Sequence, residues 1–319
     1  MVSTISRRKT MALLGGTVAF VGAPRVIAAE ASLVRVSLLP IYSVAPHFAA
    51  EKLGYFAAER ITVTTQPIQT GAVGIPGLLS GSFDVLYTNT VSVLTALERG
   101  IDIRILAEAT RVPAAPPEGL ALFRRKGEPI TSGKDLEGKT LAINARFTLQ
   151  WLTMNRWIKR TGGDVTKVNF REIPLPSMLD ALKSKQADAA FLLDPYKMVA
   201  LSDPAVELFA WPSTTVIPGL STGVWVVSGK WADANPDIAR GYLRAYMKGG
   251  KWVNDNLGQP DYLDLVAGFT KMDPKLIAEM PRVPQEMNIS LEAIHGLAEV
   301  MQEFDLLKSK VDVTPKIFK

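Results

Sequence analysis

Three short polar segments follow predicted strands in the first half of the chain, and their residue types suit the binding of a small polar molecule. The first offers an aromatic ring face and a hydroxyl group, and the third offers three side chains that can hydrogen-bond a ligand's oxygen atoms. The second precedes a helix, whose free N–H groups favour an anion. Each segment also has a structural alternative, because hydroxyl and amide side chains cap helices and glycine forms turns. In chain order, the segments are Tyr42 and Ser43, then Thr70, Gly71 and Ala72, then Thr88, Asn89 and Thr90.

A fourth segment, at residues 144–148, follows a predicted strand in the second half of the chain. The guanidinium of Arg146 can bind a carboxylate or a sulfonate through two hydrogen bonds. The ring of Phe147 can stack on a planar ligand, and Thr148 begins the next helix. The alternative is a solvated arginine beside a phenylalanine of the core. These three residues are further candidates for ligand contact.

The composition excludes much of enzyme chemistry. The chain has no cysteine, which excludes disulfides, thiolate zinc sites, iron–sulfur clusters, a cysteine nucleophile and a lipoprotein anchor. Its two histidines are His47 and His295, and lone histidines on helices are usually packing or surface residues. We therefore expect no catalytic residue, no metal site and no cofactor.

The first 31 residues have the features of an export signal. A basic head with Arg7, Arg8 and Lys9 precedes a short apolar run and a small-residue cleavage site ending at Ala31. The adjacent arginines resemble the twin-arginine export signal, and a general secretory signal is the alternative. Cleavage would remove four positive charges and one negative charge from the formal net +5, which leaves +2. We expect a soluble periplasmic protein, and the basic balance does not indicate a nucleic-acid partner.

The residues after the export signal alternate between strand and helix patterns, which favours mostly parallel sheets covered by helices. A proline-rich tract at 112–117 separates a first α/β unit from a second, because a helix cannot continue through it. The second unit ends near residue 211, and a helical tail follows one more strand. Strands are expected at 34–39, 61–68, 84–87, 103–107, 120–123, 140–144, 168–173, 189–193 and 224–228. Helices are expected at 46–58, 71–80, 90–97, 148–160, 177–185, 236–257, 260–270, 274–280 and 291–304.

Several short phrases also occur in order across about residues 33–260. The first is a strand followed by a helix that ends in Gly54-Tyr55-Phe56, and the second is a small-residue loop before Leu78-Leu79-Ser80-Gly81-Ser82-Phe83-Asp84. Later phrases are found at 135–143, 181–190 and 194–196. In this ordered set the chain resembles the periplasmic substrate-binding proteins of nitrate, sulfonate and taurine ABC importers, and also those for thiamine precursors.

The resemblance implies a type II periplasmic-binding-protein clamshell with two α/β lobes. Lobe 1 would comprise residues 32–115 and 215–319, and lobe 2 residues 116–214. Such a protein captures a small polar organic solute, such as a sulfonate, a taurine-like compound, a carboxylate or a heteroaromatic precursor, between its lobes. It then delivers the solute to an ABC permease and its ATPase, which it contacts at the lobe rims. The resemblance thus implies a monomeric binding protein and not an enzyme.

The resemblance adds Asp194 and Tyr196 to the candidate site, because the family has an acidic residue, a proline and an aromatic residue facing the cleft there. Asp194 could instead cap the following helix. A carboxylate in the site suits an amine or a ring N–H, so Arg146 and Asp194 together favour a zwitterion or a polar heterocycle. Two other functions remain open at this point: an exported enzyme on the same scaffold, and a periplasmic ligand sensor partner.

Overall fold

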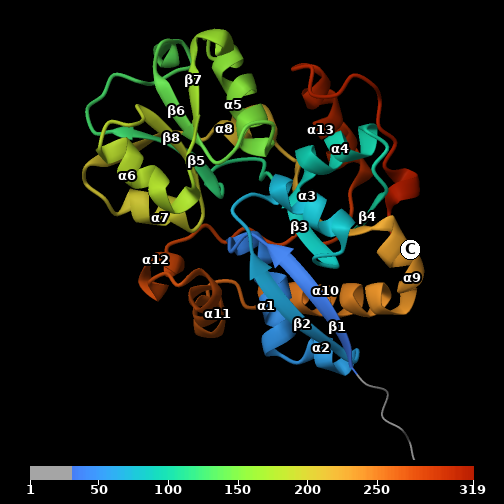
Figure 1. Cartoon of the computed structure of the whole chain (residues 1–319). Coiled ribbons are helices and arrows are strands. Elements are labelled where there is room, and N and C mark those ends of the chain that lie inside the picture. Colours follow the sequence, from blue (N-terminus) through green and yellow to red (C-terminus); the bar gives the residue numbers. More distant parts are fainter. Residues whose placement is uncertain (1–30) are drawn as a thin grey trace, which may run out of the picture. The chain divides into compact units, whose positions relative to one another are not determined.

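The computed structural model describes residues 31–319 and contains two five-stranded sheets. Residues 1–30, which hold most of the predicted export signal, lie outside the described residues. The first sheet has the order β2 (Ile61–Pro67), β1 (Ser32–Leu38), β3 (Val85–Asn89), β10 (Ser221–Ser228) and β4 (Ile103–Arg111). The second has the order β7 (Asn169–Glu172), β6 (Thr140–Ile143), β8 (Ala189–Leu193), β5 (Leu120–Arg125) and β9 (Val206–Ala210). We call these two sheets, with the helices that cover them, the first and the second lobe (Figure 1).

Each sheet contains one strand that runs against the other four. In the first lobe this strand is β10, which pairs antiparallel with β3 and β4, while β1 pairs parallel with β2 and β3. In the second lobe it is β5, which pairs antiparallel with β8 and β9. In each lobe, this is the strand that the chain enters after it crosses from the other lobe. The two-lobed α/β fold with mixed, mostly parallel sheets is therefore confirmed.

The helices follow the sequence pattern closely. In the first lobe, the expected helix at 46–58 is divided at Gly54, which has a φ of 72°. The α-helices are α1 (Ala45–Lys52), α2 (Tyr55–Ala58), α3 (Gly71–Ser80), α4 (Thr90–Glu98), α5 (Leu149–Arg160), α6 (Met178–Lys183), α7 (Tyr196–Leu201), α8 (Pro212–Val216), α9 (Gly229–Ala234), α10 (Pro236–Asp255), α11 (Pro260–Thr270), α12 (Pro274–Ala278) and α13 (Leu291–Gln302). Short 3₁₀ turns occupy Tyr42–Val44, Lys134–Leu136, Val165–Lys167, Leu175–Ser177 and Thr314–Lys316.

Four elements were not expected from the sequence: β9, α7, α8 and α9. The strands of the first lobe lie within residues 32–111 and 221–228, and those of the second within residues 120–210. The lobe boundaries at 115 and 215 stay a prediction. Within the described part of the chain, no helix combines the length and the apolar character that a membrane span requires.

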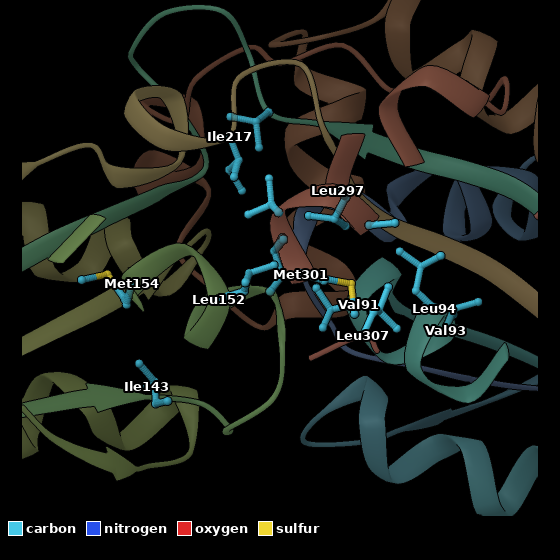
Figure 2. Packing of buried hydrophobic residues seen from close by; sticks show 14 of the residues in the cluster. Val91, Val93, Leu94, Ile143, Leu152, Met154, Ile217, Leu297, Met301 and Leu307 are labelled. Atoms are coloured by element: carbon cyan, nitrogen blue, oxygen red, sulfur yellow. The ribbon is translucent and has the colours of Figure 1, made fainter. Parts of the chain in front are cut away.

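A continuous apolar cluster includes side chains from both lobes. Figure 2 shows part of it, where Val91 and Leu94 of α4 lie near Leu297 and Met301 of α13, with Leu152 of α5 on the side of the second lobe. Burial of each such side chain contributes roughly 1.5–3 kcal/mol. The helical tail therefore packs on the first lobe through α4 and also shares apolar contacts with the second.

The chain crosses between the lobes in two segments, 112–119 and 211–220, and these segments are hydrogen-bonded to each other. The amide of Val112 donates to the Leu220 carbonyl at 3.0 Å, and the amide of Gly219 donates to the Val112 carbonyl at 2.9 Å. The tail makes a further connection, because Met198 of α7 belongs to the same buried cluster as Tyr262 of α11 and Ile277 of α12.

Candidate functional site

A cavity lies between the two sheets and is lined by both lobes. It measures about 90 Å³, well below the roughly 300–1,000 Å³ that is usual for ligand pockets. The lobes are therefore close together in this arrangement, and a larger ligand needs them to separate.

The cavity lies at the edge of the sheets where parallel strands have their carboxyl ends, as expected for an open α/β fold. Residues that follow β1, β3, β4, β6 and β8, or that end them, line it. The antiparallel strands contribute their first residues instead. Leu120 of β5 pairs with Leu193 at the end of β8, and Gly223 of β10 pairs with Asn89 at the end of β3.

Five of the residues predicted from the sequence line this cavity: Tyr42, Ser43, Gly71, Asn89 and Thr148. Two of them also have structural hydrogen bonds. Asn89 Oδ1 accepts from the amide of Ser92 at 3.0 Å, and Thr148 Oγ1 donates to the Ala145 carbonyl at 2.8 Å. Asn89 and Thr148 therefore line the cavity and also make local structural hydrogen bonds.

Thr70, Thr88 and Thr90, from the same predicted segments, do not line the cavity. Thr88 is fully buried, and a Cβ on Gly71 would lie 2.4 Å from its Oγ1, so α3 lies directly against β3. Thr90 forms a 2.9 Å hydroxyl contact with Ser221. Thr70 precedes the first residue of α3, and Ala72 is the second residue of that helix.

Arg146 and Phe147 lie outside the cavity, contrary to the expectation that they bind and stack on a ligand there. The guanidinium of Arg146 is directed back to β7, where Nη2 donates to the Phe170 carbonyl at 2.9 Å. Phe147 has a φ of 57° and is 62 % exposed. Its ring lines a separate surface pocket with residues of the first lobe, including Arg99 and Lys308.

Asp194 and Tyr196 also lie outside the cavity lining. Asp194 is 1 % exposed, and its Oδ2 lies 3.0 Å from Nζ of Lys197. Tyr196 lines a neighbouring pocket with Pro67 and Leu175. Neither Arg146 nor Asp194 lines the cavity, so this pair does not favour a zwitterion as the ligand there.

Several residues that line the cavity were not among the sequence candidates. Thr110 and Thr222 extend a row of hydroxyl groups from the predicted Ser43: Ser43 Oγ lies 3.4 Å from Thr110 Oγ1, which lies 2.6 Å from Thr222 Oγ1. Burial raises the pKa of Tyr87 to about 12, so its hydroxyl is neutral at physiological pH. The others that carry polar side chains are Arg111, Glu118, Asn144 and Gln150.

Arg111 and Glu118 are the charged side chains in the lining, and they differ in how they are paired. Arg111 donates to Glu108, Glu286 and the carbonyl of Asn288. Glu118 is 1 % exposed, and its Oε1 accepts from the amide of Thr214 at 3.1 Å. Burial raises the pKa of Glu118 to about 7, although the Thr214 amide, Ser213 and Lys197 act in the opposite direction.

Lys197 is fully buried next to the backbone of Glu118. Its Nζ donates to the backbone carbonyl of Glu118 and lies 5.2 Å from the centre of the Trp211 ring. Burial raises the pKa of Asp194, and the ammonium group of Lys197 opposes that rise. A buried ion pair therefore supports the segment that carries Glu118.

Comparison with known structures shows the same fold in two binding proteins. The aliphatic sulphonate binding protein SsuA of Escherichia coli superposes with a TM-score of 0.72 at 17% identity, over 90% of this chain and 97% of that one. The nitrate-binding protein NrtA of Synechocystis PCC 6803 gives a TM-score of 0.72 at 13% identity, over 89% of this chain and 84% of that one.

Sequence comparison gives a curated relative and a family. The riboflavin-binding protein RibY of Chloroflexus aurantiacus is 25% identical over 229 residues, which are 71% of this chain and 62% of RibY. The chain thus spans less than two thirds of the length of that relative. The model of the family described as NMT1/THI5 like matches residues 42–258, from the 3₁₀ turn at the cavity to just beyond the end of α10. The chain therefore belongs to the NMT1/THI5 like family.

Proposed function

We propose that this protein is the periplasmic solute-binding component of an ABC importer and that it binds one small polar organic solute between its lobes. The observation that carries the proposal is the cavity itself, to which both α/β lobes contribute polar side chains. Closure of two lobes around a ligand is a known response of such receptors.

The family and the fold support this function. The chain belongs to the NMT1/THI5 like family, and proteins named for sulphonate, nitrate and riboflavin binding are similar to it. The basic, apolar and small-residue sequence of the first 31 residues supports export to the periplasm. We propose that the mature protein is a monomer, delivers its solute to a permease through the lobe rims, and does not transform it. Tyr42, Ser43, Gly71, Asn89 and Thr148 are the proposed contact residues.

A thermal-shift screen tests the proposal. The panel contains alkanesulfonates, taurine, aromatic carboxylates, thiamine precursors, riboflavin and nitrate. A ligand present at 100 times its dissociation constant stabilises the folded protein by about 2.7 kcal/mol, which raises the melting temperature by several degrees. Calorimetry on a hit should give one site per chain. Catalytic consumption of a hit by the purified protein would contradict a pure binding function.

A matched pair of variants locates the binding site. Leu120 lines the cavity, whereas Leu201 is 47 % exposed at the end of α7. Leu120→Trp should fill the cavity and abolish the ligand-induced shift, while Leu201→Trp should retain it. Melting of both variants without ligand separates a loss of binding from a loss of folding, since overpacking alone costs about 1–3 kcal/mol. Retention of the shift in Leu120→Trp would place the site elsewhere.

A further inference from the structure

Two buried acceptor atoms at the cavity have no hydrogen-bond partner among residues 31–319. They are Oε2 of Glu118 and Oδ1 of Asn144, and both residues line the cavity. The opposite oxygen of Glu118 is held by the amide of Thr214 at the start of α8, which fixes the carboxylate in place. Buried polar atoms without partners are rare and costly in folded proteins, so these two require an explanation.

The positive charges close to the cavity are already paired. Arg111 uses four of its five N–H groups on Glu108, Glu286 and a backbone carbonyl. Lys197 donates to Asp194 and to the backbone carbonyl of Glu118. The side-chain charge that remains unmatched in the lining of the described structure is thus the negative charge of Glu118 in its ionised form.

Two helix starts at the cavity can supply hydrogen-bond donors. The helices α3 and α5 begin at Gly71 and Leu149, both in the lining, and neither has a side-chain hydrogen bond at its N-cap. Their first amide groups are available to acceptor atoms of a ligand. The cavity therefore has acceptors at Glu118 and Asn144 and donors at the two helix starts.

We propose that Glu118 determines specificity by selecting solutes that carry an N–H group, such as an amine, an amidine or a ring N–H. The N–H group hydrogen-bonds Glu118 Oε2, with Asn144 Oδ1 as a second acceptor, while acceptor atoms of the solute meet the starts of α3 and α5. A cationic N–H group is favoured, because it balances the buried carboxylate. Nitrate and simple alkanesulfonates have no such group and place negative charge beside Glu118. This inference rests on the proposed function.

Matched pairs of probes test the requirement for an N–H group. Taurine and ethanesulfonate differ by one amino group, as do 4-aminobenzoate and benzoate, and riboflavin supplies a ring N–H. Binding of each probe is measured by calorimetry and thermal shift. We expect at least one N–H probe to bind at least tenfold more tightly than its partner or than nitrate.

Variants of the two acceptors test the assignment to Glu118. Glu118→Gln retains a carbonyl for the Thr214 amide but replaces the free acceptor by a donor, so binding of the N–H probe should weaken at least tenfold. Asn144→Ala removes the second acceptor without affecting α8 and should weaken the same probe by a smaller factor. Glu128→Gln is the control, because Glu128 pairs with Arg125 away from the cavity lining. Melting without ligand shows that each variant is folded.

The outcomes separate the inference from the proposed function. Selective binding of N–H probes that both acceptor variants weaken supports the inference. Equal or tighter binding of ethanesulfonate, benzoate or nitrate, or unchanged binding of an N–H probe in Glu118→Gln, overturns it and leaves solute binding intact. If none of these probes nor any member of a wider metabolite library shifts the melting of the wild-type protein, the proposed function fails and this inference fails with it.

Discussion

Nζ of Lys197 lies 3.0 Å from Oδ2 of Asp194, and both side chains are buried beside the interlobe cavity. The ion pair is local in sequence, since the residues are three positions apart at the start of α7. The same ammonium group donates to the carbonyl of Glu118, which belongs to a segment where the chain crosses between lobes. Loss of either partner would leave the other charge buried without compensation.

Replacing Lys197 by methionine should destabilise the protein strongly. The variant keeps most of the side-chain volume but removes the partner of Asp194, and breaking a buried pair in this way costs about 3–5 kcal/mol. Urea denaturation measures the loss. Lys183→Met is the control, because Lys183 pairs with Asp203 at an exposed site and the variant should lose far less stability. Equal, small losses of unfolding free energy in both variants would show that the buried ion pair stabilises the protein no more than the exposed one.

Glu118 should make the folded protein more stable as the pH falls from 8 to 5. Burial raises the pKa of this carboxyl to about 7 from its ordinary 4.5, so the folded state binds a proton that the unfolded state does not. By linkage, the stabilisation is complete below pH 4.5 and is lost as the pH rises through 7, a change of about 3 kcal/mol. The free energy of unfolding of Glu118→Gln, compared with wild type at each pH, should lack this contribution. If the difference in unfolding free energy between the two proteins is the same at every pH, Glu118 does not make this contribution.

His47, unlike Glu118, should make the folded protein less stable as the pH falls. Its ring is fully buried, with Nδ1 3.0 Å from Tyr242 Oη and Nε2 3.0 Å from Thr65 Oγ1, and burial lowers its pKa to about 3. Below pH 6.5 the unfolded state takes up a proton that the folded state does not, so wild type loses about 2 kcal/mol by pH 5.

The pH profile of His47→Gln checks this contribution, because the variant should not show the acid loss. Thr65→Val retains the imidazole ring and should keep the loss. If the profiles of His47→Gln and wild type run parallel, His47 is not the source. The contributions of His47 and Glu118 partly cancel in wild type over this range, so only the variants reveal them separately.

Gly71→Ala should disturb the wall of the cavity. The added Cβ would lie 2.7 Å from Cα of Thr88, so α3 must move away from β3. We expect a loss of about 1–3 kcal/mol by thermal denaturation, together with weaker solute binding. Gly268→Ala is the matched control within α11, since nothing lies within 4 Å of its added Cβ. That variant should be neutral or gain about 0.5–1 kcal/mol. Similar losses in both would refute the steric argument.

The fold was predictable because its main elements have long, clear patterns. The expected helix at 71–80 has the same bounds as α3, and the expected strand at 189–193 has those of β8. The short elements were missed for a physical reason. The strand β9 has only one well-buried residue, Val206, and α8 has only five residues, two of which are threonines. Neither segment therefore has the repeated spacing of apolar residues that would predict it from the sequence.

The site is only partly predictable from the sequence, because the positions that follow the carboxyl ends of strands include only some of the residues that line the cavity. That rule finds Asn89 and Thr148 but fails for an antiparallel strand, whose first residues lie at the same edge. Glu118 lies two residues before β5, and Thr222 is at the start of β10, so the rule identifies neither. Thr110 and Arg111 were missed because the strand expected at 103–107 continues as β4 to Arg111.

The predicted site residues that lie outside the cavity make contacts with other residues that the sequence does not reveal. Asp194 has a partner only because α7, which was not expected, brings Lys197 onto the same face. Arg146 turns to the Phe170 carbonyl because β7 lies beside β6, a pairing that has no signal in the local sequence.

The paired hydrogen bonds between Val112 and residues 219–220 also have an entropic consequence. Two connections held side by side leave the lobes few relative orientations when no solute is bound. The freedom that is lost on closure is then small, and less of the interaction energy with the solute is spent on ordering the protein. Under the proposed function, this pairing of the two crossing segments would favour tighter binding of the solute.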